Sequence, residues 1–347
     1  MKNPLIVLLS LMILLSLPLS SAAQQYAHAG EYMGAIGEMY EDLAKDQWTY
    51  IKASSHSRSA RRIERKRQDL LQTNRAMQRS LSRMPAFEGD ASLRDSTVQY
   101  LRMCYDVLNE DYGKIVDLEA IAEESYDAME AYLAAKEKAS NRLDEAGDRL
   151  QAHQKVFAAS HNVQLLESEK SRTALRLEQA GQTINYYNRI YLIFFKSYKQ
   201  EAYLMEAAQA GDLSALVQNQ QALLEFAEQG LASLDTLPDF EGDASLKQTC
   251  RQLLLFYQQE AQEAVPVMAD FFLKKETFEK VKTAVEAMRP QDRTEEDVNR
   301  YNAAVDEFNA AVAAYNQVNE QLSARRSTLV KDWNKTTEKF MDQHVPR

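Results

Sequence analysis

The segment FEGDASL occurs twice in this chain without change, at residues 87–93 and 240–246, which lie 153 positions apart. The similarity continues on the N-terminal side, where an offset of 154 aligns the segment that begins at Tyr32 with the one that begins at Tyr186. Matches that extend over so much of a chain at nearly constant spacing indicate an internal duplication. The chain therefore has to fold into two copies of one structural unit.

Long helices are expected because helix-breaking residues are scarce: the 347 residues include only 10 Gly and 7 Pro. Hydrophobic residues make up 45% of the chain and charged residues 27%, a balance typical of a soluble globular protein. We predict an all-α protein, an internal duplication of an elongated four-helix bundle with no sheet. The expected helices are 31–53, 58–83, 91–138 and 141–180 in the first copy, and 184–209, 213–236, 244–288 and 295–343 in the second.

The N-terminus has the pattern of a secretory signal peptide. A single basic residue, Lys2, precedes an apolar run and a group of small residues that ends at Ala23. The apolar run is shorter than the ~20 residues that a membrane-spanning helix needs, although a retained anchor is the alternative. We therefore expect residues 1–23 to be cleaved. The mature protein would be exported to the periplasm or the cell surface, without a transmembrane segment.

Two further signals organise the repeats. Gly181 and Thr183 are expected to form the stop and restart between the copies. Gly113 and Pro266 align at the offset of 153, and both disfavour helix, so we expect a kink at this point in each copy. The predicted domains are a first helical repeat over residues 26–181 and a second over residues 184–346.

The FEGDASL segment is interpreted as a joint between the second and third helices of each copy. Pro85 and Pro238 are expected to end the preceding helix, and a short acidic loop of this kind has too few carboxylates for a calcium site. In each copy the aromatic residue plugs the bundle end, the glycine permits a tight turn and the aspartate caps the next helix. The structural joint residues are Phe87, Gly89, Asp90, Phe240, Gly242 and Asp243.

No signature of catalysis or cofactor binding is present. The formal net charge of −10 disfavours a nucleic-acid partner, because phosphate binding needs a basic surface. The chain lacks the HExxH, CxxC, GxxxxGK[ST] and GxSxG patterns, and His153 and His161 alone are too few for a metal site. We predict no enzyme, no cofactor and no metal, and we expect Cys104 and Cys250 to be buried free thiols.

One helix carries a strongly patterned polar face. Between Ser57 and Arg83, apolar residues repeat on one side and arginines on the other, whereas the equivalent helix of the second copy contains no arginine. We interpret this arginine face as a binding surface for an anionic envelope glycan, a lipid headgroup or an acidic protein. The alternative is a solvated helix that is paired to acidic neighbours on the following helix. The arginine face consists of Arg58, Arg61, Arg62, Arg65, Arg75, Arg79 and Arg83.

A second pattern lies near the C-terminus, where Tyr301, Phe308, Tyr315 and Leu322 recur every seven residues. This spacing predicts a helix–helix seam. Stacking of these aromatic rings on sugars is the alternative.

Three parts of the chain, NYYNRIYLIFFKSYKQEAYL from residue 185, the FEGDASL joint and the YN…FN…YN series near the C-terminus, carry a resemblance to a known family. Over essentially the whole mature chain, the sequence resembles an uncharacterised family of predicted bacterial surface proteins of the Bacteroidetes and Leptospira type. The resemblance implies an exported, envelope-associated helical protein. It implies no catalytic residue, cofactor or partner, and the arginine face is not part of its pattern.

The sequence thus predicts an exported, non-catalytic protein of the cell envelope that acts by binding or scaffolding. One alternative is a carrier that encloses a small ligand, since Met, Tyr and Phe recur at helical spacing. Another is an enzyme of unrecognised type, which would need carboxylates and histidines to converge in one pocket.

Overall fold

The computed structural model describes residues 26–56, 59–111, 122–165 and 171–345. Within these residues every regular element is a helix, which confirms the all-α prediction. The chain divides into two compact units, of which the first comprises Met1–Asn188 and Glu338–Arg347 and the second Arg189–Thr337. The predicted repeats were 26–181 and 184–346. The structure differs at the C-terminal end, where the residues from Glu338 onward pack with the first unit.

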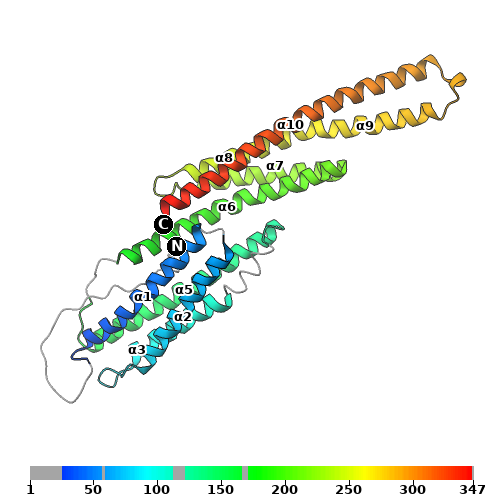
Figure 1. Cartoon of the computed structure of the whole chain (residues 1–347). Coiled ribbons are helices and arrows are strands. Elements are labelled where there is room, and N and C mark those ends of the chain that lie inside the picture. The colour runs from blue at the N-terminus through cyan, green and yellow to red at the C-terminus, as the bar shows by residue number, and fades with distance from the viewer. Residues whose placement is uncertain (1–25, 57–58, 112–121, 166–170, 346–347) are drawn as a thin grey trace. The chain divides into compact units, whose positions relative to one another are not determined.

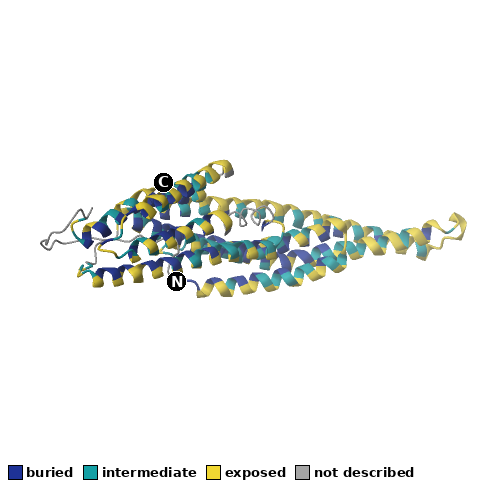
Figure 2. Ribbon diagram, turned by 90° about the horizontal axis from the view of Figure 1, so that it is seen from below, coloured by how far each residue is buried: buried dark blue, intermediate teal, exposed yellow. Residues whose placement is uncertain are grey.

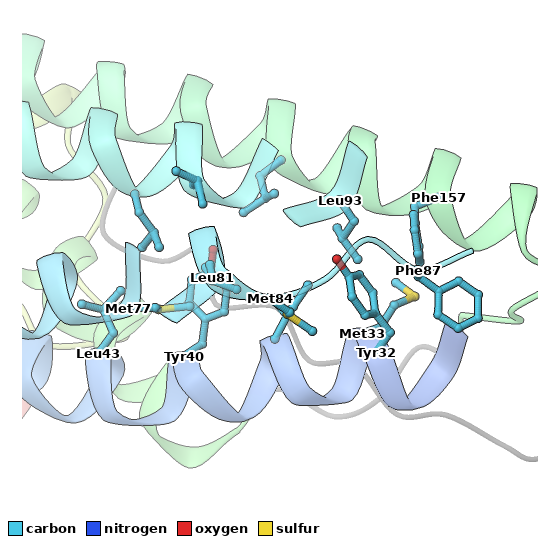
Figure 3. Close-up of a cluster of buried hydrophobic side chains, with 14 of the residues drawn as sticks. Tyr32, Met33, Tyr40, Leu43, Met77, Leu81, Met84, Phe87, Leu93 and Phe157 are labelled. Carbon is cyan, nitrogen blue, oxygen red and sulfur yellow. The ribbon is translucent and has the colours of Figure 1, made fainter. Parts of the chain in front are cut away.

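The first unit is built on four helices that pack in sequence order (Figure 1). Buried apolar residues recur on the facing sides of these helices, and Figure 3 shows Tyr40 from the first helix beside Leu81 from the second. Phe157, from the last helix, stacks on Tyr32 with ring centroids 5.7 Å apart. The elements are α1 (Ala29–His56), α2 (Ala60–Arg83), α3 (Ser92–Asp106) with a π-helical end η1 (Val107–Asp111), and α5 (Tyr126–Ser160).

The second unit repeats this order and adds a long hairpin. Phe271 and Phe278 of one hairpin helix stack on Phe308 of the other, which confirms the predicted seam. The far end of the hairpin is mostly exposed or half-buried (Figure 2). Two helices are shared between the units: α6 (Arg172–Ala210) enters the second unit at Arg189, and α10 (Glu295–His344) leaves it after Thr337. The other elements of the second unit are α7 (Leu213–Thr236), α8 (Ser245–Gln259) with a π-helical end η2 (Glu260–Ala264), α9 (Val265–Glu286) and a 3₁₀ turn η3 (Pro290–Asp292).

Helix boundaries follow the sequence repeat closely. The pairs α2/α7, α3/α8 and η1/η2 each begin and end 153 residues apart, which is compatible with the predicted duplication. The offset rises to 183 at the C-terminal end, where Phe340 stacks on Tyr186 at 5.9 Å as Phe157 stacks on Tyr32. The offset increases by 30 residues between the end of η2 at Ala264 and Phe340, in the segment that contains the α9–α10 hairpin.

The two FEGDASL joints have nearly identical geometry. Gly89 and Gly242 adopt φ of +86° and +84°, a region that favours glycine, and each joint closes with an isolated bridge between its Phe and its Asp. The expected aspartate caps were misplaced by one residue, because Ala91 and Ala244 are the N-caps. The aspartates nevertheless accept a backbone N–H, from Ser92 and Ser245, both at 2.8 Å.

The proline and aromatic residues of the joints also have the expected roles in part. The residues before Pro85 and Pro238 are the extended C-caps Met84 and Leu237, so the helices end where the prolines predict. Phe87 is buried in the core, as expected, whereas Phe240 is only half-buried.

The predicted kinks correspond to π-helical segments. In the second unit the irregularity is η2, immediately before Pro266, whereas Gly113 lies outside the described residues. A proline has no N–H, and the carbonyl of Ala261 instead accepts from Gln220 Nε2 at 2.7 Å. The equivalent carbonyl of η1, on Leu108, accepts from Arg67 Nη1 at 2.6 Å. A side chain from the second helix therefore caps the π segment in both units.

Several predicted helix boundaries are wrong. The helix predicted for 141–180 is interrupted, because α5 ends at Ser160 and α6 begins at Arg172. The third helix does not continue to residue 138, because Ser125 caps a new helix by accepting the N–H of Ala128 at 3.1 Å. That helix, α5, runs without a break through the predicted gap at 139–140. The stop and restart at Gly181 and Thr183 is also absent: α6 passes through both, and the Thr183 hydroxyl donates to the carbonyl of Gln179 at 2.7 Å. One helical Gly lowers stability by only about 1 kcal/mol, too little to end a packed helix.

Replacing Gly89 or Gly242 by Ala should lower the free energy of unfolding by about 1 kcal/mol, because an L side chain is strained at positive φ. The matched control is Gly37→Ala, which lies inside α1 with no atom within 4 Å of an added Cβ. This control should be neutral or stabilising by up to about 1 kcal/mol. Urea midpoints measure the difference, and equal effects of Gly89→Ala and Gly37→Ala would contradict it.

Candidate functional sites: an arginine face and a buried carboxylate pair

The arginine face lies on the outer side of α2. Its opposite side packs into the core, where Leu70, Met77 and Leu81 are buried and Ile63 is partly buried. The outer side is left to solvent because the bundle needs only one apolar stripe from each helix. Arg58 lies outside the described residues. The exposed members of the face are Arg61, Arg62, Arg65, Arg75, Arg79 and Arg83.

The other basic residues of α2 are paired with carboxylates, whereas the six described members of the arginine face have no carboxylate partner among the described residues. Lys66 binds Asp69 at 2.8 Å, and Arg67 binds Glu64 at 2.7 Å. Among the described residues, no carboxylate lies within 4.0 Å of any guanidinium of the face, although Arg75 stacks over Tyr105 at 4.3 Å. Three of the acidic neighbours that could neutralise the face, at positions 111, 117 and 119, lack described side chains. Within the described residues, the cationic groups are therefore available to a partner.

The corresponding helix of the second unit has the opposite charge. Helix α2 contains eight Lys and Arg against two Asp and Glu, a formal charge of +6, whereas α7 contains three acidic residues and no basic one, a charge of −3. Both helices have 24 residues and the same position in the fold. The positive charge is therefore not a requirement of the bundle.

The FEGDASL joint of the first unit includes a histidine that sequence reasoning did not place there. His161 Nε2 lies 2.9 Å from Asp90 Oδ2, and its Nδ1 lies 3.8 Å from Glu88. Hydrogen bonds from Ser92 and then His161 lower the pKa of the Asp90 carboxyl. In the described part of the chain, no group of three or more His, Cys, Asp or Glu could hold a metal ion.

The second unit contains a buried cluster of two carboxylates and one arginine. Glu201 on α6 is 3% exposed, and Glu260, the first residue of η2, is 1% exposed. Arg326 on α10 donates from Nε to Glu201 Oε1, and from Nη2 to Glu260 Oε1 at 2.8 Å. If both carboxylates were ionised, the cluster would hold one uncompensated negative charge in the interior, which is strongly unfavourable.

The protonation of the pair follows from this charge balance. Burial and the neighbouring Glu201 charge raise the pKa of Glu260 to about 8. Burial also raises the pKa of Glu201, against the attraction of Arg326. Protonated Glu260 can donate a hydrogen bond to Glu201, and this donated bond favours the charged form of Glu201. At neutral pH the carboxylate pair therefore holds one proton beside the cationic Arg326.

The first unit has an apolar contact at the same place. The counterparts of Glu201, Glu260 and Arg326, at offsets of 154, 153 and 183, are Gln47, Val107 and Leu143. Val107 and Leu143 pack with Ala139 and Cys104 in a hydrophobic cluster. Sequence reasoning missed the ionic cluster, although a Glu aligned with a Val at a core position was a signal that could have revealed it.

Both cysteines are buried free thiols, and they belong to different units. Burial raises the pKa of Cys104 to about 12, so its thiol is protonated and unreactive at neutral pH.

Across the described residues, no helix combines the length and apolar character that crossing a membrane requires. Comparisons with protein-family models, with curated proteins and with solved structures gave no match for this chain.

Arg326→Leu should lower the stability of the second unit by about 3–5 kcal/mol, because it leaves the negative charge of the carboxylate pair buried without a counter-charge. The matched control is Glu201→Gln/Glu260→Val/Arg326→Leu, which reproduces the residues of the first unit. It should fold with a stability within about 1 kcal/mol of the original, or higher.

The measurement is urea unfolding followed by the fluorescence of Trp333, which is 3% exposed in the second unit. Trp48→Phe removes the one other tryptophan. If the triple substitution is as damaging as Arg326→Leu, the charge-balance account of this cluster is wrong.

Proposed function

We propose that this is an exported, non-catalytic protein of the cell envelope that binds or scaffolds through the arginine face of α2, and that its partner is an acidic glycan. The observation that supports the proposal is the row of exposed guanidinium groups without carboxylate partners among the described residues, on a helix whose counterpart has none. Export and the resemblance to bacterial surface proteins remain predictions from the sequence.

The shape of the face favours a linear partner. Residues 61 to 83 span 22 positions, and at about 1.5 Å per residue the row is roughly 33 Å long. At about 100° per residue, Arg65, Arg75, Arg79 and Arg83 lie within about 40° of the direction of Arg61 around the helix axis, and Arg62 lies beside this row. An extended polyanion can follow such a track, whereas a small anion would contact only one or two of its groups.

The chemistry of the side chains favours oxyanions. Seven of the eight basic residues of α2 are Arg, whose planar guanidinium binds carboxylate, sulfate or phosphate through two parallel hydrogen bonds. Attraction to a membrane surface would be expected to include apolar residues beside the charges. The most exposed large apolar residues of the described chain all lie on other helices.

Arg75→Gln/Arg79→Gln/Arg83→Gln should weaken binding to heparin, used as a model acidic glycan, by about tenfold at low salt. Three exposed contacts of about 0.5 kcal/mol each sum to this factor. The dependence of log Kd on log salt should also become shallower, because fewer counterions are released.

The matched control is Lys331→Gln/Lys335→Gln/Lys339→Gln, which removes the same charge at the same spacing from exposed positions of α10. It should leave the affinity nearly unchanged. If both variants lost the same heparin affinity, net charge alone would explain the effect, and the proposal would be contradicted. If the protein bound anionic vesicles but not heparin, the partner would be a lipid surface and not an acidic glycan.

A further inference from the structure

The buried carboxylate cluster joins three helices at the base of the α9–α10 hairpin. Glu260 stands where α8 ends and the π segment η2 begins, Arg326 lies on the returning helix α10, and Glu201 comes from α6. The segment that follows Glu260 leads directly into α9. The state of this cluster therefore bears on how firmly the hairpin is attached within the second unit.

We propose that Glu201 and Glu260 form a proton-binding site. One shared proton keeps the helical hydrogen bonds of η2 formed (the closed state), and loss of that proton lets them break (the open state). The geometry carries this proposal: two carboxylates that are almost completely buried share one guanidinium. Glu260 Oε2 is buried, and no donor among the described residues faces it. A proton on this oxygen removes the unpaired acceptor and provides a donor for Glu201.

The groups around the pair do not supply a second positive charge. Tyr198 comes from α6 and the buried Tyr257 from α8, and burial raises the pKa of Tyr257 well above its usual value. From α7, the uncharged Gln220 contacts the carbonyl of Ala261. Arg325 on α10 is exposed and donates to Gln259. Arg326 is therefore the cation that contacts both carboxylates, and it can neutralise only one of them.

The π segment η2 has irregular backbone hydrogen bonding. Pro266 contributes no N–H, and the carbonyl of Ala261 depends on a side chain for its hydrogen bond. When Glu260 loses its proton, two like charges lie next to each other in the interior. Opening of η2 lets water reach the second carboxylate, so we expect strain from the repulsion to be released there.

The experiment measures amide hydrogen exchange of the full chain between pH of about 6 and 8, corrected for the intrinsic rate at each pH. Glu260 holds its proton in the closed state up to about pH 8 but loses it near its ordinary pKa when exposed. The stability of the closed state of η2 relative to the open state is therefore greatest at low pH and falls as the pH rises. The protection of η2 should fall by up to about tenfold per pH unit over this range.

The internal control is η1, which has the same length and position but carries Val107 in place of the glutamate. Its protection should not change with pH. Glu260→Gln should keep η2 protected equally at both ends of the range, since the amide is neutral throughout. The proposal is overturned if η1 and η2 lose protection together, or if Glu260→Gln retains the pH dependence of the original chain.

Discussion

Each unit depends on a change of helical register at the π segment, and on the hydrogen bond that this change makes necessary. In the second unit Pro266 has no N–H to donate, so the carbonyl of Ala261 needs another donor. Gln220 supplies this donor, and Arg67 donates to the carbonyl of Leu108 in the first unit. Both donors come from the second helix, so this bond ties α2 to η1 and α7 to η2.

Because of this shared constraint, the charged residues of α2 fall into two groups: those that the bundle uses in its own contacts and those that are exposed to a partner. Arg67 is fixed by the Leu108 carbonyl and by Glu64, and it stabilises the bundle. The arginine face points away from these contacts, and α7 has no arginine at the corresponding positions. Conversely, the second unit has acidic and basic residues in its core where the first has Val107 and Leu143. The two copies thus share a scaffold and differ in where charge is placed.

Much of the fold could be predicted from the sequence because the signals are local. Proline before the joint, glycine at positive φ and the heptad of Tyr301 and Phe308 act over a few residues, and the structure has the expected elements there. Gly181 misled because packing outweighs one residue's propensity. The arginine face was visible as a pattern. The carboxylate cluster was not, because Glu201, Glu260 and Arg326 are distant in sequence and meet only through tertiary packing.

The central claim, that the arginine face and not the bundle determines binding, is tested most directly by moving the face. The five outermost arginines, Arg61, Arg65, Arg75, Arg79 and Arg83, would be changed to Gln and their exposed α7 counterparts, Ser214, Gln218, Glu228, Ala232 and Thr236, to Arg. Heparin affinity of the two chains, with and without the added arginines, is then compared by titration. The account predicts that binding is lost with the first set and restored with the second. Binding that survives the first set, or fails to return with the second, would contradict it.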